Sequence, residues 1–228
     1  MRTISLLKKL EDLPLFTDND VSKLVNKEAD YVKTLLYRLR KQGLIKRIEK
    51  GKYTTHDDPM IFSTHLMYPS YLSLWTALRY FNMTQQQPMD LFVMTPIKRK
   101  DINYQNKRIR FIKTKQMFGY RKERYFDFDV FIAEKEKAII DSMLYKIPLV
   151  DIIYALDAEE INFEKLVEYA KKTKNISLIK RVGYILETKT GKSFGLIAKD
   201  NNFIKLDYHS TNNGKKNNKW KLIVNMKI

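Results

Sequence analysis

Two carboxylates, Asp127 and Asp129, are separated by one residue in the apolar run Phe126 to Ala133. Side chains two apart on a strand share a face, so this pair could hold a divalent metal for nucleotidyl or phosphoryl transfer. Such a pair is common, and no matched third carboxylate or Gly-Ser motif accompanies it. The simpler interpretation is two surface acids that pair with neighbouring bases.

Other groups that could perform catalysis are scarce. The three histidines, His56, His65 and His209, lack the spacing of metal ligands. The chain has no cysteine, which excludes disulfides, thiolate zinc sites and a cysteine nucleophile. It also has no glycine-rich phosphate loop. We therefore expect no metal, no cofactor and no enzymatic activity, and a metal-dependent enzyme using Asp127 and Asp129 remains the alternative.

Basic side chains between Tyr31 and Thr55 favour binding to nucleic acid. This stretch holds eight Lys or Arg residues and a single acid, Glu49. On a helix at about 100° per residue, most of its basic and tyrosine side chains lie opposite the apolar positions. Lys and Arg neutralise phosphates, Arg can hold guanine with two hydrogen bonds, and Tyr and Thr can contact phosphates or thymine methyl groups. The candidate DNA-binding residues are Lys27, Tyr31, Lys33, Thr34, Tyr37, Arg38, Arg40, Lys41, Lys46, Arg47, Lys50 and Lys52.

The elements that carry these residues begin with a helix after Thr17. Thr17 can accept a hydrogen bond from the amide of Asp20, and the acid suits a helix N-terminus. Asn26 and Lys27 break this helix before the next one. A helix–turn–helix is therefore expected here.

The second helix is expected from Glu28 to Gln42, where Gly43 ends it in a left-handed conformation. Its apolar face carries Val32, Leu35, Leu36 and Leu39. A strand then leads to a turn at Lys50 and Gly51, and Tyr53 begins the return strand. This order predicts a winged helix-turn-helix, which places one helix in the DNA major groove. Two alternatives remain open, a helical hairpin with a solvated basic face and a winged helix that contacts proteins.

A second basic stretch runs from Lys98 to Arg124, with eleven bases, two acids and interleaved aromatics such as Tyr104 and Phe111. Bases among aromatics suit phosphate neutralisation and base stacking. Alternation equally fits a strand pair with a basic outer face and aromatic core residues. The second set of DNA-binding candidates is Lys98, Arg99, Lys100, Lys107, Arg108 and Arg110.

The length allows two modest domains or one large one. The expected elements indicate an α+β protein with a winged helix-turn-helix at 1–58 and a mixed α+β domain at 59–228. The net charge is +17, of which residues 1–58 carry +4 and the remainder +13. This excess favours a polyanion, with nucleic acid ahead of membrane. The sequence shows no signal peptide and no apolar stretch that could span a membrane, so a cytoplasmic location is expected.

Apolar periodicity predicts the remaining elements. An amphipathic helix is expected at Met1–Leu13 and a polar loop at Asn212–Asn218. Further helices are expected at Tyr71–Phe81, Glu134–Tyr145, Leu149–Leu156, Phe163–Lys172 and Ser177–Lys189. Strands are expected at Asp90–Thr95, Arg108–Lys113, Phe118–Tyr125, Phe126–Ala133, Phe203–Tyr208 and Trp220–Ile228.

Four blocks in order resemble the AbiEi-type antitoxins of type IV toxin–antitoxin systems. The blocks are YLSLWTALRYFNMTQQQP (Tyr71–Pro88), FIAEKEKAIIDSMLY (Phe131–Tyr145), KRVGYILE (Lys180–Glu187) and WKLIVN (Trp220–Asn225). In that family an N-terminal winged helix precedes the antitoxin domain, so the resemblance covers nearly the whole chain. The stretch Lys98–Lys113 is more basic than the family pattern.

The resemblance implies a repressor of its own operon that binds inverted repeats in double-stranded DNA, as a monomer or a dimer on the operator. It also implies a functionally linked nucleotidyltransferase-like toxin, with no stable complex between the two proteins. A module that neutralises a partner protein directly is a further alternative.

Overall fold

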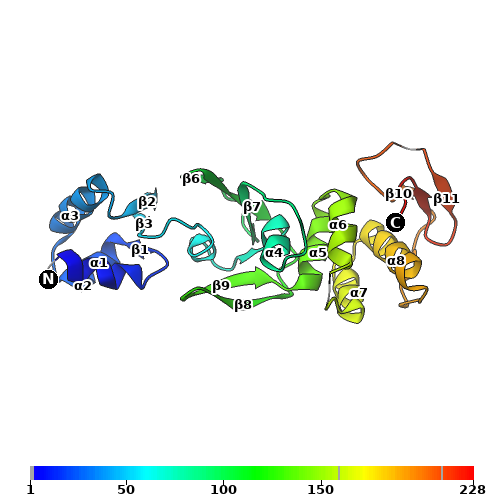
Figure 1. Cartoon of the computed structure of the whole chain (residues 1–228), viewed down its shortest axis with the longest axis horizontal. Helices are drawn as coiled ribbons and strands as arrows, with labels where there is room; N and C mark the ends of the chain where they lie inside the picture. The colour runs from blue at the N-terminus through cyan, green and yellow to red at the C-terminus, as the bar shows by residue number, and fades with distance from the viewer. Residues whose placement is uncertain (1–2, 159, 212) are drawn as a thin grey trace. The chain divides into compact units, whose positions relative to one another are not determined.

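The computed structural model describes residues 3–158, 160–211 and 213–228 (Figure 1). It is 37% helical and 21% strand, which confirms the mixed α+β class. The chain forms two compact units, each described here by itself. The first contains Met1–Leu72, Pro88–Lys115 and Lys122–Ile132, and the second contains Ser73–Gln87, Gln116–Arg121 and Ala133–Ile228. The domain boundary expected after residue 58 stays a prediction.

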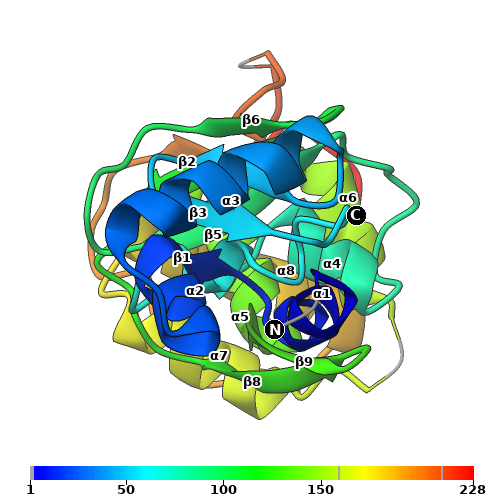
Figure 2. The same cartoon turned by 90° about the vertical axis from the view of Figure 1, so that its left-hand side faces the viewer.

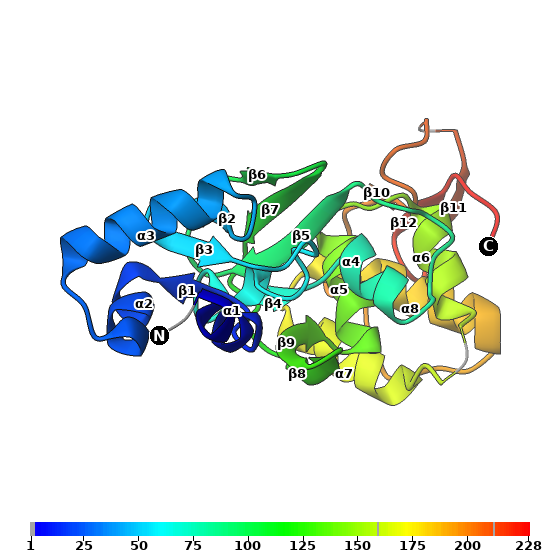
Figure 3. The same ribbon diagram turned by 60° about the vertical axis from the view of Figure 1, so that its left-hand side comes forward.

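The first unit begins with three helices and a small antiparallel sheet (Figure 3). The helices are α1 (Thr3–Glu11), α2 (Asp18–Val25) and α3 (Ala29–Lys41). The strands are β1 (Phe16–Thr17), β2 (Lys46–Glu49) and β3 (Lys52–Thr54), in the order β1-β3-β2. Helix α1 was expected at residues 1–13, of which residues 1 and 2 lie outside the described part.

Local signals in the sequence account for these boundaries. The Thr17 hydroxyl accepts a hydrogen bond from the Asp20 amide, and the Asp20 carboxylate accepts one from the Thr17 amide at 2.8 Å. The first of these two hydrogen bonds was predicted, and together they form a reciprocal cap that fixes the start of α2. Asn26 ends α2 in a left-handed conformation, and Gly43 follows α3 at φ +72°, as expected.

Helix α3 is held by its apolar face. Val32, Leu36 and Leu39 are buried as predicted, and Leu35 is partly buried. They pack with residues of α1, α2 and the strand region, namely Leu6, Leu10, Phe16, Val21 and Ile45. Burying a side chain of this kind contributes about 1.5–3 kcal/mol. The rotational setting of α3, and so the face that it turns outward, follows from this core.

A six-stranded sheet follows, in the order β6-β7-β5-β4-β9-β8. Its strands are β4 (Tyr71–Leu72), β5 (Asp90–Thr95), β6 (Ile102–Tyr104), β7 (Lys107–Lys113), β8 (Tyr120–Tyr125) and β9 (Phe128–Ala133), with a short 3₁₀ helix, η1 (Ser63–His65), before β4. Strand β5 pairs in parallel with β7 along its whole length and is buried at five of six positions, which explains its apolar sequence.

The helix expected at Tyr71–Phe81 is shorter than predicted. Tyr71 and Leu72 form strand β4, because they pair with Met94 and Val93 of β5. Leu74 then adopts φ +55°, and α4 (Trp75–Tyr80) begins after it. The apolar run is buried as expected, but pairing with a distant strand decides its backbone conformation.

The strand expected at Phe126–Ala133 also begins later. Phe126 has φ +50° and is 72% exposed, so Phe126 and Asp127 form the turn between β8 and β9. Val130 is buried as expected. The prediction that Asp127 and Asp129 share one strand face is therefore wrong, since Asp127 precedes the strand.

Four further helices belong to the second unit, with α6 and α7 packed on α5 and α8 packed on α7 (Figure 1). They are α5 (Lys135–Leu144), α6 (Leu149–Leu156), α7 (Phe163–Lys172) and α8 (Ile176–Thr190), close to their predicted bounds. A sheet of three short strands follows, β10 (Ile204–Lys205), β11 (Lys215–Asn217) and β12 (Leu222–Val224), in the order β10-β12-β11. Both C-terminal strands are shorter than expected, and β11 lies where a loop was expected. Asn212 of that loop is outside the described residues.

Polar contacts join parts of the second unit that are distant in sequence. The fully buried Asp141 accepts a hydrogen bond from Ser73 at 2.8 Å and pairs with the buried Lys137. Burial lowers the pKa of Lys137, and the charge of Asp141 opposes that shift. The Trp220 indole donates to Glu187 of α8 at 2.6 Å. These contacts give structural roles to residues from all four of the blocks Tyr71–Pro88, Phe131–Tyr145, Lys180–Glu187 and Trp220–Asn225.

In the part of the chain that the structure describes, no helix has the length and apolar character needed to cross a membrane.

Candidate nucleic-acid interface

Helix α3 (Figure 2) carries four of the predicted DNA-binding residues on its outward face. Thr34, Tyr37, Arg38 and Lys41 are all exposed, and Tyr37 is 57% exposed. Tyr31 and Lys33 are exposed beside them. A hollow of ≈ 340 Å³ on this face is lined by Asp30, Tyr31, Thr34, Leu35 and Arg38. The residues that sequence periodicity grouped together thus lie on one accessible surface.

Positive charge on α3 is concentrated in its C-terminal half. Arg38, Arg40 and Lys41 lie there without an acid, and within the described residues none of the three forms an ion pair. Arg40 lies over the ring of Tyr37 at 5.9 Å, which holds the two side chains together. The N-terminal half is nearly neutral, because Lys33 pairs with Asp30 at 3.2 Å.

The Thr34 hydroxyl already makes a hydrogen bond within its own helix. Its hydroxyl donates to the Asp30 carbonyl at 3.0 Å. The hydroxyl oxygen can still accept a hydrogen bond, so Thr34 would serve as an acceptor or through its methyl group. Lys27 lies at the turn before α3, in a hollow of ≈ 530 Å³ lined by Ser22, Lys23, Asn26, Lys27, Glu28 and Ala29.

In the β2–β3 hairpin, two of the four predicted DNA-binding residues already form ion pairs within the protein. Lys46 pairs with Asp57 at 2.6 Å, and Lys52 pairs with Glu49 at 2.9 Å while donating to the Leu66 carbonyl. Both lysines are only partly exposed. Lys50 at the tip is exposed and has no ion pair within the described chain. Arg47 is exposed and its Nε donates to the Glu49 carbonyl at 3.2 Å. The free positive charge of the hairpin is therefore carried by Lys50 and Arg47.

Glu49 and Asp57 are the acids that take up this charge. Burial raises the pKa of Glu49, but hydrogen bonds from Lys52 and Arg99 outweigh burial and hold that pKa below its ordinary value. Hydrogen bonds from Lys46 and Gln105 lower the pKa of the Asp57 carboxyl. Both carboxyl groups are therefore ionised at neutral pH and carry the negative charge that attracts their basic partners.

The second set of candidates is largely paired within the protein. Arg99 donates to Glu49 at 2.6 Å, Arg108 to Asp101 at 2.6 Å, and Arg110 to Asp90 at 3.5 Å. Lys107 lies 3.5 Å from Asp58. Lys98 and Lys100 are exposed and form no ion pair among the described residues. Four of the six basic residues in this second set therefore form ion pairs within the protein.

Two aromatic residues of the stretch Lys98–Arg124 lie in the core. Tyr104 is 4% exposed and Phe111 is 7% exposed, and Arg99 covers the Phe111 ring at 4.6 Å. Of the two interpretations left open, this burial favours core aromatics over a stacking surface. A role of Lys98 and Lys100 in phosphate binding stays a prediction.

Of the two carboxylates, Asp129 pairs with neighbouring bases, as the simpler interpretation predicted. Asp129 accepts from Lys122 at 3.0 Å and from Arg124 at 3.4 Å, and the Lys122 hydrogen bond is the main reason that the Asp129 pKa is lowered. Asp127 lies outside the strand and is exposed. Across residues 3–158, 160–211 and 213–228, no cluster of three or more His, Asp or Glu side chains could hold a metal ion.

Sequence reasoning missed the acids that neutralise these bases. Asp57, Asp58 and Asp101 were not predicted as site residues, yet each pairs with one of the candidate bases. Spacing offers no signal for such pairs, because Lys107 is 49 residues from its partner Asp58. No model of a known protein family matches the chain, and no curated protein matches it.

Proposed function

We propose that residues 1–58 form a winged helix-turn-helix and that the protein is a sequence-specific transcriptional repressor that binds double-stranded DNA. The order α2, α3, β2 and β3 supports this proposal, since a winged helix has these parts in this sequence. In this assignment α3 is the recognition helix and the β2–β3 hairpin is the wing.

The observation that carries the proposal is the exposed surface of α3. A helix of 13 residues is about 20 Å long, and the major groove, about 12 Å wide, admits a helix. One face of α3 is fixed in the core, and the opposite face presents Tyr37, Arg38 and Lys41. A solvated helix face ordinarily mixes acids with bases, whereas the C-terminal half of this face holds bases alone.

Some of the basic side chains bind the phosphates of the DNA backbone, and others contact the base edges. Arg40, Arg47 and Lys50 attract the duplex and bind phosphates, which sets position but carries no sequence information. Arg38 donates two hydrogen bonds to a guanine edge, and Thr34, Tyr37 and Lys41 contact neighbouring groups in the groove. Lys46 and Lys52 support the hairpin through their internal ion pairs and contribute less to phosphate binding.

The biological setting follows from the four blocks that resemble AbiEi-type antitoxins. We propose that the protein represses its own operon by binding inverted repeats in the promoter. The functionally linked partner would be a nucleotidyltransferase-like toxin, without a stable complex. Reading an inverted repeat with a single recognition helix per chain needs two copies on the DNA.

The proposal is tested by titrating the full chain against a labelled duplex from the promoter of its own gene. The double variant Arg38→Ala/Lys41→Ala is compared with Lys8→Ala/Lys9→Ala, which removes the same charge from the exposed surface of α1. The α3 variant should weaken binding by about tenfold or more, and the α1 variant by less than about threefold. Wild-type affinity should also fall steeply between about 50 and 200 mM salt. Equal losses of DNA affinity in the two variants would show that α3 is not part of the interface.

A further inference from the structure

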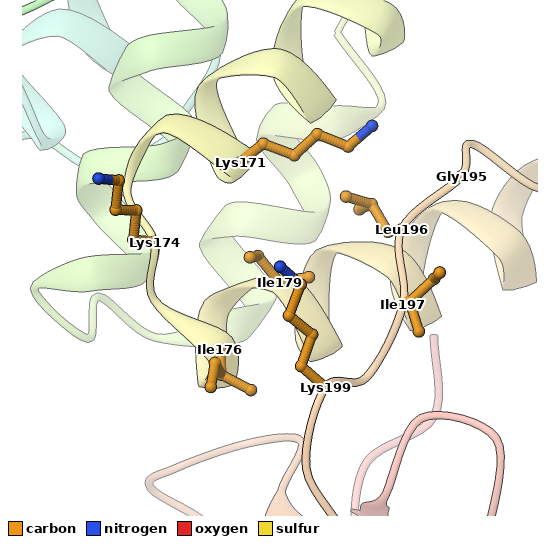
Figure 4. A pocket seen from close by; sticks show the side chains of 8 residues that line it. All are labelled: Lys171, Lys174, Ile176, Ile179, Gly195, Leu196, Ile197 and Lys199. Carbon is orange, nitrogen blue, oxygen red and sulfur yellow. The ribbon is translucent and has the colours of Figure 1, made fainter.

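A hollow of ≈ 700 Å³ in the second unit lies between the end of α7, the start of α8 and the segment that follows α8 (Figure 4). Its volume falls in the range of pockets that hold small organic ligands, about 300–1,000 Å³. It is lined by Lys171, Lys174, Ile176, Ile179, Gly195, Leu196, Ile197 and Lys199. Apart from the glycine, the lining consists of aliphatic side chains and lysines.

The aliphatic residues form a floor and an exposed edge. Ile179 and Leu196 are 8% and 7% exposed. Ile176 is 36% exposed and Ile197 is 70% exposed, so both present apolar surface to water. Covering such surface is favourable by about 25 cal/mol per Å². The pocket therefore offers apolar area that an aliphatic ligand would bury.

The lysines give the pocket a single sign of charge. The lining has no acid, and among the described residues Lys171, Lys174 and Lys199 form no ion pair. In Figure 4 the side chains of Lys171 and Lys199 extend along the pocket, whereas the ammonium group of Lys174 points away from it. Lys171 and Lys199 are thus placed to hold an anionic group beside the aliphatic floor.

The surrounding sequence strengthens this positive field. Residues 171–228 hold fourteen Lys or Arg side chains and three Asp or Glu side chains, a net charge of +11 out of the +17 of the chain. A cluster of one sign raises the local concentration of opposite charge. An anion is therefore the favoured occupant, and a cation would be repelled.

We infer that this pocket binds a linear aliphatic carboxylate, with the acyl chain on Ile176, Ile179, Leu196 and Ile197 and the carboxylate between Lys171 and Lys199. A nucleotide fits less well, because the lining contains no aromatic ring for base stacking. The same chemistry, an acyl chain that ends in an anion, could come from a free fatty acid or from a lipid in a membrane. The open aliphatic edge and the limited volume favour the free molecule.

The test is isothermal titration calorimetry of the full chain with sodium decanoate below its micellar concentration. Decylamine has the same chain with the opposite charge, and butyrate has the same charge with a short chain. Decanoate should bind at least about tenfold more tightly than either. Comparable binding of decylamine would overturn the role of the lysines, and comparable binding of butyrate would overturn that of the aliphatic floor.

Variants locate the site. Lys171→Gln/Lys199→Gln should weaken decanoate binding about tenfold, whereas Lys192→Gln/Lys215→Gln removes two exposed lysines outside the lining and should leave it unchanged. Ile197→Ser, at an exposed position, should also weaken binding. Unaltered far-UV circular dichroism checks the folding of each variant. Equal effects of the two lysine pairs would refute the site, as would binding to anionic phosphatidylglycerol vesicles without binding to monomeric decanoate.

Discussion

Arg99 donates to one carboxylate oxygen of Glu49 at 2.6 Å, and Lys52 donates to the other at 2.9 Å. Glu49 ends strand β2 of the hairpin, and Arg99 lies 50 residues later in the chain. One acid thereby engages two of the bases predicted to bind DNA and offsets half of their combined charge. The Arg99–Glu49 pair also joins the tip of the hairpin to the segment before β6, within the first unit.

Replacing Glu49 by Gln should lower the stability of the first unit in a pH-dependent way. The folded-state pKa of Glu49 lies below its ordinary value of 4.5, so its stabilising contribution is present above that value and disappears as the pH falls through the folded pKa. At pH 7 the variant should lose about 1 kcal/mol of unfolding free energy. Urea unfolding at pH 7 and pH 3 measures the difference, which should shrink at pH 3. Glu11→Gln, at an exposed acid that forms no ion pair in the described chain, is the control. A pH-independent loss would contradict this assignment.

Gly51 shapes the hairpin tip through its backbone. Its φ is +73°, and an added Cβ would meet no atom within 4 Å. Gly51→Ala should therefore cost about 1–2 kcal/mol through conformation alone, and Gly51→Asn should cost less because Asn tolerates this region. Thermal unfolding of both variants compares them. An alanine variant as stable as the wild type would show that the turn can adopt a different conformation.

The Trp220 ring packs so closely against α8 at Gly183 that this position has no room for a side chain. A Cβ at this position would lie 2.1 Å from the Trp220 ring, too close for any side chain. Gly183→Ala should therefore displace a buried tryptophan and destabilise the second unit by about 3 kcal/mol or more. Gly191→Ala is the matched control, since its added Cβ meets nothing within 4 Å and only its φ of +68° is unfavourable. Chemical unfolding measures the stability of both variants. A larger loss for Gly191→Ala than for Gly183→Ala would be inconsistent with this packing.

Local rules predicted much of the first unit. The apolar spacing of Val32, Leu36 and Leu39 fixed the outward face of α3, and the reciprocal cap of Thr17 and Asp20 fixed the start of α2. Periodicity also gave the helices of the second unit to within about a residue or two. In these segments, residues that are close together in the sequence determine the backbone conformation.

Long-range contacts determine the features that the local rules did not predict. Tyr71 and Leu72 have the composition of a helix start, but pairing with β5 makes them a strand. The charge of Arg99 appeared free from the sequence, because its partner Glu49 is remote along the chain. The candidate interface was therefore predicted as a set of residues, while the division between engaged and accessible bases required the structure.

The most direct test of α3 as a recognition helix is the ratio of dissociation constants for promoter and scrambled duplexes, measured for the wild type, Arg38→Ala and Arg38→Lys. Arg38 is exposed on the face opposite the core, and lysine keeps its charge but not its two-pronged donor geometry. Both variants should reduce the preference for promoter DNA about tenfold, at a cost of about 1–3 kcal/mol on that duplex, and Arg38→Lys should leave binding to scrambled DNA nearly unchanged. An unchanged ratio in both variants, with both duplexes bound equally weakly, would contradict base readout by α3.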